Sequence, residues 1–443
     1  MVHSFRGGTH VRHEKQRTAG KPIEPMPLPE RLVVPLRQHI GAAPEPIVAR
    51  GDLVAKGQLL ARSDAYVSAT VHAPTSGVIK DILELPHPTL GKGMAFVLEP
   101  DGRDAWVEGL PTERDWRDLD PDALRELVRA GGVVGLGGAA FPTHVKLSPP
   151  AGTVLEHVVV NGAECEPYLT SDDAVMRARA EDLVTGIEIL LRITGAAHGH
   201  VGIEANKPEA LKVVAAAARR LPQVRVVALP TRYPQGAERS ILQALLGKWV
   251  PAGQLPLSVG AIVQNTTTCV AIADAVVRGI PVIDKVLTVS GAAVVTPRNV
   301  LARIGTSWRD VLDFCGGPTE DLGRLVMGGP MMGVAQNSFD APVIKATSGL
   351  LALSKAEVAH PPEGPCLRCG MCVTVCPMAR KPLDFPTMAE LHLVRQADAA
   401  GILECIECGT CEYACPANRP ILQSIQVLKA KVRAARAQAA ATR

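Results

Sequence analysis

The chain has 443 residues and a nearly balanced charge, with 47 Lys and Arg against 44 Asp and Glu and a formal net charge of +3. Its length predicts roughly three domains, and its hydrophobic share of 47% is that of a globular protein. Balanced charge and an aromatic share of only 3% argue against a nucleic-acid surface. With no long apolar run and no apolar core of a secretion signal, we expect a cytoplasmic protein without direct membrane insertion.

The first part of the chain predicts an arm and a β domain. Residues 1–30 are rich in Pro, Gly and charge and lack apolar periodicity, so we expect an irregular N-terminal arm. Short apolar segments between turn residues follow in 31–105 and predict a small flattened β barrel. Its sequence resembles the biotinyl/lipoyl-carrier fold. The modifiable lysine of those carriers is missing from residues 63–66, so we expect the fold without the covalent cofactor.

Helical and strand patterns alternate in residues 115–280 and predict an α/β domain with a mainly parallel sheet. A glycine-dense loop at 131–142 follows a predicted helix, and Lys146 lies just beyond it. Three polar segments, 161–168, 233–239 and 264–267, each follow a predicted strand. Any one of them is explained by helix capping, but three together with the glycine loop predict a ligand crevice at the carboxyl edge of the sheet.

The remaining chain returns to short strands in 282–340, where we expect a small mixed β domain, and it ends in an Ala- and Arg-rich tail that we expect to be a frayed helix. Three cysteines outside the runs described next lack ligand spacing. Cys269 and Cys315 are expected to be buried thiols, and Cys165, inside a polar segment, is ambiguous.

Eight of the eleven cysteines fall in two runs with the spacing C-x2-C-x2-C-x3-C-P. This is the bacterial ferredoxin pattern, in which the fourth cysteine of each run ligates the other cluster. Structural zinc is the alternative, and the doubled run with matching prolines disfavours it. The predicted ligands are Cys366, Cys369, Cys372 and Cys415 for cluster one, and Cys405, Cys408, Cys411 and Cys376 for cluster two.

The glycine loop and the segments 161–167 and 233–238 resemble the flavin- and NADH-binding subunit of respiratory complex I. Over residues 4–430, in its motifs and domain order, the chain is most similar to the RnfC family of Rnf-type ion-translocating ferredoxin:NAD oxidoreductases. The resemblance implies a multidomain α/β and α+β protein. Its parts are an arm (1–30), a biotinyl-like β barrel (31–105), a Rossmann-like FMN/NADH-binding α/β domain (115–280), a soluble-ligand-binding β-grasp domain (282–340), a two-cluster ferredoxin domain (360–425) and a tail (426–443).

The resemblance also implies noncovalent FMN, with NAD(H) stacked over it and Phe141 and Glu166 near the nicotinamide. Hydride transfer to a flavin needs no side-chain acid or base, so no catalytic residue is named. The implied FMN-binding residues are Gly135, Gly137, Gly138, Lys146, Asn161, Glu164, Tyr233, Gly236, Glu238 and Asn265.

The function implied is electron transfer between NAD(H), FMN and two 4Fe–4S clusters. The partners implied are integral and peripheral subunits of an Rnf-type complex, at the cytoplasmic face of the bacterial inner membrane. Two alternatives stay open: a subunit with clusters but no flavin of its own, and a related flavin/iron–sulfur cobalamin reductase. Flavin absorbance distinguishes the first, and the domain order disfavours the second.

Overall fold

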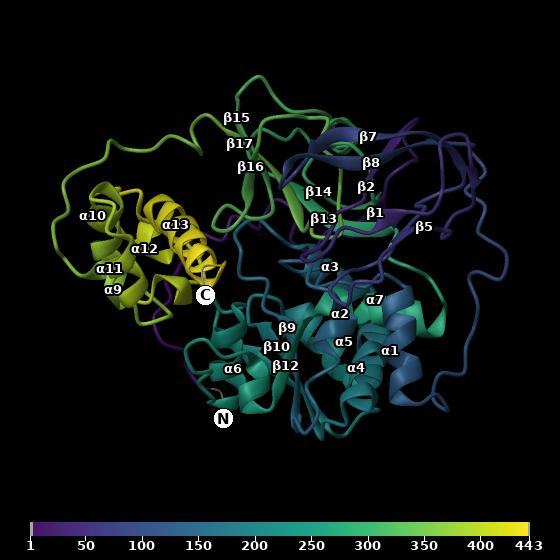
Figure 1. Cartoon of the computed structure of the whole chain (residues 1–443), viewed down its shortest axis with the longest axis horizontal. Helices are drawn as coiled ribbons and strands as arrows, with labels where there is room; N and C mark the ends of the chain where they lie inside the picture. Colours follow the sequence, from purple (N-terminus) through teal and green to yellow (C-terminus); the bar gives the residue numbers. More distant parts are fainter. Residues whose placement is uncertain (1–2, 442–443) are drawn as a thin grey trace.

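In the computed structural model, which describes residues 3–441, the first sheets of the chain form a flattened β domain at one side of the molecule (Figure 1). Two sheets pack together, with strand orders β2-β8-β7-β4 and β3-β5-β6. A long hairpin of β7 and β8 dominates, and its length was not expected from the sequence. The strands are β2 Leu32–Pro35, β3 Glu45–Pro46, β4 Leu53–Val54, β5 Leu59–Arg62, β6 Val71–His72, β7 Gly77–His87 and β8 Gly91–Pro100.

The central α/β unit contains a four-stranded sheet in the order β11-β10-β9-β12, with every neighbouring pair parallel, as the sequence predicts. Going across the sheet, one meets the third, second, first and fourth strand of this unit in chain order, so the direction of the strand order reverses between β9 and β12. Ligands bind at such a reversal in open α/β sheets. The elements are α1 Pro121–Ala130, α2 Thr143–Lys146, β9 His157–Gly162, α3 Ser171–Ala178, α4 Ala180–Thr194, β10 His198–Glu204, α5 Pro208–Ala218, β11 Val224–Leu229, α6 Glu238–Leu246, β12 Ala261–Asn265 and α7 Thr266–Val277.

Helices cover both faces of this sheet. Alternate strand residues explain this, because Val158 and Val160 point into the core formed with α1, α4, α5 and α7, while Val159 points into a second core with α6. Local signals fix the helix ends. Asp120 accepts hydrogen bonds from two amides of the first turn of α1, and Gly195 ends α4 in the left-handed conformation at φ +67°.

A six-stranded mixed sheet follows in the order β1-β14-β13-β17-β15-β16. Its first strand comes from the N-terminal arm, which is therefore not irregular throughout. Its central strand β17 lies beyond residue 340, where the sequence places the end of this domain. The elements are β1 Ile23–Pro25, β13 Asp284–Ser290, β14 Arg298–Arg303, α8 Trp308–Phe314, β15 Leu322–Met327, β16 Val334–Gln336 and β17 Gly349–Ser354.

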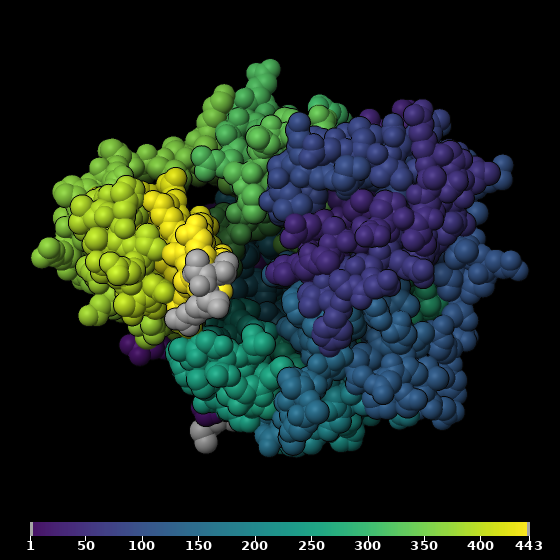
Figure 2. Space-filling view, in the orientation of Figure 1, coloured from purple at the N-terminus to yellow at the C-terminus, as the bar shows by residue number. Residues whose placement is uncertain are grey.

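The two cysteine runs lie in a small helical unit at the opposite side of the molecule from β5 (Figure 1), and Figure 2 shows a hollow between this unit and the β domain. Its core contains Phe385, Ala397, Ile402, Ile425 and Leu428. The tail is helical, as expected, but it is not separate, because α13 begins at Ile421 and continues through Ala441; residues 442–443 lie outside the described residues. The helices are α9 Met371–Thr374, α10 Phe385–Glu390, α11 Val394–Ala399, α12 Thr410–Tyr413 and α13 Ile421–Ala441.

Candidate functional site: a glycine-lined crevice and two cysteine cavities

The glycine loop lies over the point where the sheet order reverses. The Leu136 amide donates to Thr268 Oγ1 at 2.9 Å, which fixes the loop to the first turn of α7. Gly137 lies so close to Asn265 that an added Cβ would meet the side-chain nitrogen at 2.3 Å. Residues 137–139 are exposed, and around Gly138 there is open space. Glycine is therefore required at 137, and the exposed backbone here is available to a ligand.

Two asparagines mark the carboxyl ends of the central strands. Asn161 of β9 and Asn265 of β12 are register neighbours. The Asn161 side-chain amide donates to the Gly236 carbonyl at 2.8 Å. The side-chain oxygen of Asn265 accepts from the backbone amide of Thr267 and so caps α7. The structure thus brings Gly137, Asn161, Gly236 and Asn265 together at one edge of the sheet, the place expected from the sequence.

Lys146, at the end of α2, already has partners. Its ammonium group lies 3.1 Å from the Glu238 carboxylate and donates to the Val263 carbonyl at 2.8 Å. Both side chains of the pair are partly exposed, at 32% and 40%. Solvent screening keeps such a pair weak, so a phosphate can compete with Glu238 for the lysine.

Glu164 has a structural role, the helix capping that the sequence offers as the alternative for each polar segment. Its carboxylate accepts hydrogen bonds from the Asp172 and Asp173 amides, at 2.6 and 3.3 Å, and so caps α3. Burial raises the pKa of Glu164 to about 7, and the nearby Lys15 ammonium opposes that shift. Lys15 comes from the N-terminal arm and donates to the Glu164 carbonyl at 2.8 Å and to the Glu166 carbonyl at 2.9 Å.

Glu166 and Tyr233 face the cysteine unit. The Glu166 carboxylate accepts from the Met331 amide at 3.1 Å and lies 3.5 Å from the Tyr233 hydroxyl. That hydroxyl donates to the backbone carbonyl of Cys408 at 2.8 Å, and the Tyr233 side chain is buried. Burial raises the pKa of Glu166 to about 7 and also raises the pKa of Tyr233. Tyr233 therefore joins the crevice domain to a predicted cluster loop, and Glu166 joins it to the segment that contains Met331.

Several residues at the crevice were missed by the sequence reasoning. Asp172 accepts from Asn265 at 2.7 Å and from Thr267 at 2.8 Å. Lys285 is buried and donates to the Leu136 carbonyl beneath the glycine loop at 2.7 Å. Asp172 follows a polar segment and could have been suspected. Lys15 and Lys285 could not, because each is separated from its partner by 149 positions in the sequence.

The crevice residues fit a flavin phosphate and its polar chain. Exposed backbone at 137–139 suits an anion, and the partly exposed Lys146 ammonium can supply a positive charge to it. Two buried amide nitrogens, Nε2 of Gln235 and Nε2 of Gln264, have no hydrogen-bond partner, and each belongs to a residue adjacent in sequence to Gly236 or Asn265. Buried donors of this kind are usually satisfied, so they suit a polar ligand.

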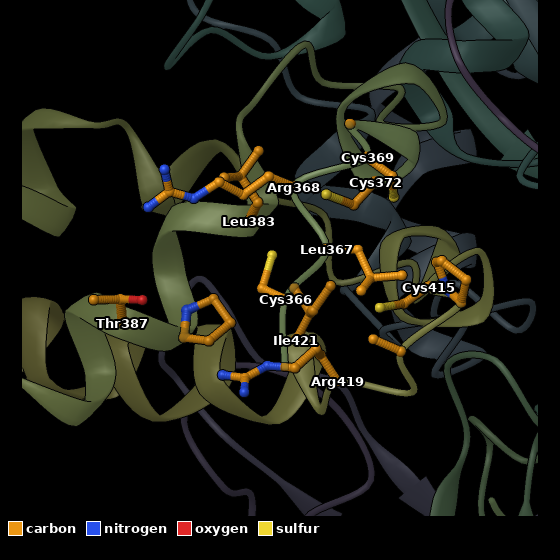
Figure 3. A pocket seen from close by; sticks show the side chains of 14 residues that line it. Cys366, Leu367, Arg368, Cys369, Cys372, Leu383, Thr387, Cys415, Arg419 and Ile421 are labelled. Carbon is orange, nitrogen blue, oxygen red and sulfur yellow. The ribbon is translucent and has the colours of Figure 1, made fainter. Parts of the chain in front are cut away.

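The cysteines surround two separate cavities. Figure 3 shows the first, where Cys366, Cys369 and Cys372 meet Cys415 from the other run. The second cavity is lined by Cys405, Cys408 and Cys411 together with Cys376. Each cavity thus has three cysteines of one run and the fourth of the other, the grouping that the spacing predicts.

The cysteine grouping suits a pair of clusters, because each run supplies three cysteines to one cavity and the fourth to the other. Burial raises the pKa of Cys405 to about 11 and that of Cys408 as well, so these thiolates need a cationic partner. The Glu407 amide donates to Cys405 Sγ at 3.3 Å, a contact type that tunes cluster potentials.

The two cavities differ in position. The second lies against the body of the molecule, since Tyr233 contacts Cys408 and the Gly8 amide of the arm donates to the Val375 carbonyl at 2.8 Å. At the first, Cys366 and Cys369 are exposed and Leu367 is 63% exposed. The second cavity is therefore the inner one and the first is the outer one.

The other three cysteines are accounted for. Cys269 and Cys315 are fully buried, which confirms the prediction from the sequence. Cys165 Sγ accepts a hydrogen bond from the Gly236 amide at 3.3 Å, and burial raises its pKa to about 12. Its role here is to hold the 233–239 segment against the 161–168 segment.

Comparison with known families agrees with this arrangement. The chain matches four family models: the RnfC barrel sandwich hybrid domain over residues 3–103, the Nuo51 FMN-binding domain over 128–274, the SLBB domain over 286–335 and the 4Fe-4S dicluster domain over 364–419. Fold and site together define a multidomain electron-transfer protein with an FMN-binding domain and a 4Fe–4S dicluster domain.

Relatives along the whole chain identify the family. The C subunit of a proton-translocating ferredoxin:NAD(+) oxidoreductase complex from Clostridium ljungdahlii is 49% identical over 98% of this chain and 95% of its own length. The Na(+)-translocating counterpart of Acetobacterium woodii is 40% identical over 98% of both chains. The C subunit of an ion-translocating oxidoreductase complex from Pseudomonas aeruginosa is 44% identical over 98% of this chain but 56% of its own length. The chain belongs to the RnfC family of ion-translocating oxidoreductase complexes.

The fold is also similar to a chain of an NAD+-reducing [NiFe]-hydrogenase in the H2-reduced state, with a TM-score of 0.50 and 19% identity over 70% of this chain and 63% of that chain. At this identity the likeness concerns the fold alone. No helix among residues 3–441 has the length and apolar character needed to span a membrane.

Proposed function

We propose that this protein moves electrons between NAD(H), an FMN in the glycine-lined crevice, and two 4Fe–4S clusters, one in each cysteine cavity. The observation that carries the proposal is the contact of Tyr233 with Cys408, which joins the FMN-binding domain to the inner cavity. A flavin accepts a hydride and releases electrons singly, which converts the two-electron chemistry of NADH to the one-electron chemistry of a cluster.

The residues of the chain hold and orient these groups. Backbone amides at 137–139 and Lys146 suit the phosphate, and the Asn161 and Asn265 amides suit the polar chain and ring. The strand order, with the crevice where it reverses, supports a Rossmann-like domain. We assign NAD(H) to the side of Phe141, which is half-buried beside the loop. Glu166, expected on the same side, accepts a hydrogen bond from the Met331 amide.

The outer cavity is the better exit to a partner. Electron transfer between proteins needs close approach, and Cys366, Leu367 and Cys369 are exposed at its mouth. We therefore place the partner contact at this surface. We further propose that integral and peripheral subunits hold the chain at the cytoplasmic face of the inner membrane. A chaotropic wash of membranes should release it, and retention on protein-free liposomes after that wash would contradict this.

Optical and EPR spectra of the anaerobically purified chain test the redox proposal. Before NADH, we expect flavin absorbance and about eight iron atoms per chain, four per cubane. After NADH, flavin absorbance should fall and reduced-cluster EPR signals should appear. A protein with iron but no flavin would instead indicate a clusters-only subunit. A corrinoid reduced at the expense of NADH would indicate the cobalamin reductase.

A further inference from the structure

Three histidines gather at the amino-terminal edge of the parallel sheet, at the opposite ends of β9 and β10 from the crevice. His157 is the first residue of β9 and pairs in register with His198, the first residue of β10. His200 lies two residues further along β10 and therefore on the same face as His198. The redox function uses none of these three side chains.

The rings are close enough to share one ion. His200 Nε2 lies 3.3 Å from His157 Nδ1. The ring centroids are 5.3 Å apart for His157 and His200, 5.7 Å for His157 and His198, and 6.4 Å for His198 and His200. Two imidazole nitrogens about 2.0–2.1 Å from a tetrahedral ion are about 3.4 Å apart, and the ring centroids then lie about 5–5.5 Å apart.

His157 and His200 already have this spacing, whereas the His198 ring is stacked on that of His157 at an interplanar angle of 25° and must turn before it can join them. In the structure, the ring nitrogens of the three histidines do not converge on one point. The same is true of every group of three His, Cys, Asp or Glu side chains within residues 3–441. The His198 side chain is exposed at the edge of the sheet, so rotation about its own bonds brings its ring nearer to the other two.

A carboxylate supports the same arrangement. Glu156 Oε2 lies 3.5 Å from His157 Nε2, the ring nitrogen that faces away from His200. A carboxylate that orients the second nitrogen of a ligating histidine is the usual support around a metal ion. Lys248 holds Glu156 in place, with its ammonium 3.2 Å from the same oxygen.

We propose that His157 Nδ1, His200 Nε2 and His198 bind one divalent transition-metal ion of the zinc class, with Glu156 as a positioning residue. Three imidazoles leave one tetrahedral position to water, and they favour zinc, nickel or cobalt over magnesium or calcium. The site is separate from the cysteine cavities, because it lies at the amino-terminal edge of the sheet and the redox groups are assigned to the other edge.

Zinc titration of the untagged holoprotein tests the proposal. The clusters stay loaded, so their thiolates cannot take up the metal, and an affinity tag must be absent because it binds zinc itself. Competition with a chromogenic zinc chelator should reveal one zinc per chain beyond background. His200→Gln and His198→Gln should each weaken binding at least about tenfold, and Glu156→Gln about 10–100-fold.

His360→Gln is the matched control, because His360 is exposed and lies outside the trio. It should bind zinc like the parent. Iron content, flavin content and melting temperature verify that each variant folds. If His200→Gln misfolds, His198→Gln still tests the proposal, because His198 is exposed and its replacement should not disturb the fold. Cobalt gives a second readout, since its visible absorption band should disappear in the trio variants. Zinc affinity in both trio variants equal to that of the parent would overturn the proposal.

Discussion

The Tyr233 hydroxyl donates a hydrogen bond to the backbone carbonyl of Cys408 across 2.8 Å, although the two residues are 175 positions apart in sequence. Around this bond, Val11, Cys165, Met331 and Ile406 complete a small apolar cluster. Five separate stretches of chain therefore meet where the FMN-binding domain contacts the inner cysteine cavity. Under the proposed function, this bond helps to set the separation between the flavin and the inner cluster, and that separation governs how fast electrons pass between them.

Removing this hydroxyl should slow electron transfer without emptying either site. In Tyr233→Phe the Cys408 carbonyl loses its partner, at a cost of about 1–3 kcal/mol in folding stability. In anaerobic stopped-flow measurements we expect flavin reduction by NADH at the parental rate and delayed bleaching of the clusters. Tyr413→Phe, at an exposed tyrosine of α12, is the control. Cluster bleaching at the parental rate in Tyr233→Phe would show that this contact does not set the separation.

Lys146→Ala should lower flavin affinity. The lysine can exchange Glu238 for a phosphate, and a charge-assisted contact contributes about 1.5–3 kcal/mol, so FMN should bind roughly ten- to a hundredfold more weakly. Both clusters should remain, and added FMN should restore activity in part. Lys248→Ala removes a similarly exposed ion pair at the other end of the same sheet and should leave flavin binding unchanged. Parental affinity in Lys146→Ala would show that the phosphate lies elsewhere.

Glu238→Gln should behave in the opposite way. It releases Lys146 from its ion pair, so the flavin should be retained, or bound more tightly. We expect slower reduction by NADH, because the carboxylate is predicted to orient the ligands and misplacement affects rate more than occupancy. Flavin titration separates affinity from the single-turnover rate of reduction. Loss of flavin from this variant would show that Glu238 is needed to hold the flavin and does not only orient it.

Serine substitutions should group the cysteines by cavity rather than by run. Cys366→Ser and Cys415→Ser should damage the same outer cluster, and Cys376→Ser should damage the inner one. Each variant should keep about four of eight iron atoms. Iron analysis and EPR report the loss, and Cys165→Ser, outside both cavities, is the control. If Cys415→Ser and Cys376→Ser lose the same signal, the exchange of fourth ligands is wrong.

The stability of the fold should depend on Glu166 in a particular pH window. Burial raises the pKa of its carboxyl from 4.5 to about 7. The folded chain then holds this proton to higher pH than the unfolded chain does, so stability falls as pH rises between those two values and is level above them. Glu166→Gln should lose less stability than the parent as pH rises from 4.5 to about 7, as measured by thermal unfolding. Equal losses in the two proteins would contradict the raised pKa.

Local patterns were easier to predict than contacts between distant segments. Cysteine spacing specifies both cavities because each run wraps its own cavity and supplies one ligand to the other. The polar residues after β9 and β12 were found because parallel strands end at one edge. The partners of Lys15 and Tyr233 were not, because each contact joins residues more than 140 positions apart. Glu164 shows a further limit, since one carboxylate serves equally well as a ligand-binding group or as a helix cap.

The N-terminal arm implies an order of assembly. Lys15 donates to the Glu164 carbonyl, the Thr9 amide donates to the Tyr233 carbonyl, and the Gly8 amide donates to the Val375 carbonyl. Translation makes the arm before any of these partners, and Val375 comes 367 residues after Gly8, so the arm cannot dock fully until the segment with the first cysteine run has been made. Its docking is then a late step of folding, and the cysteines of the inner cavity stay accessible from the arm's side until it takes place.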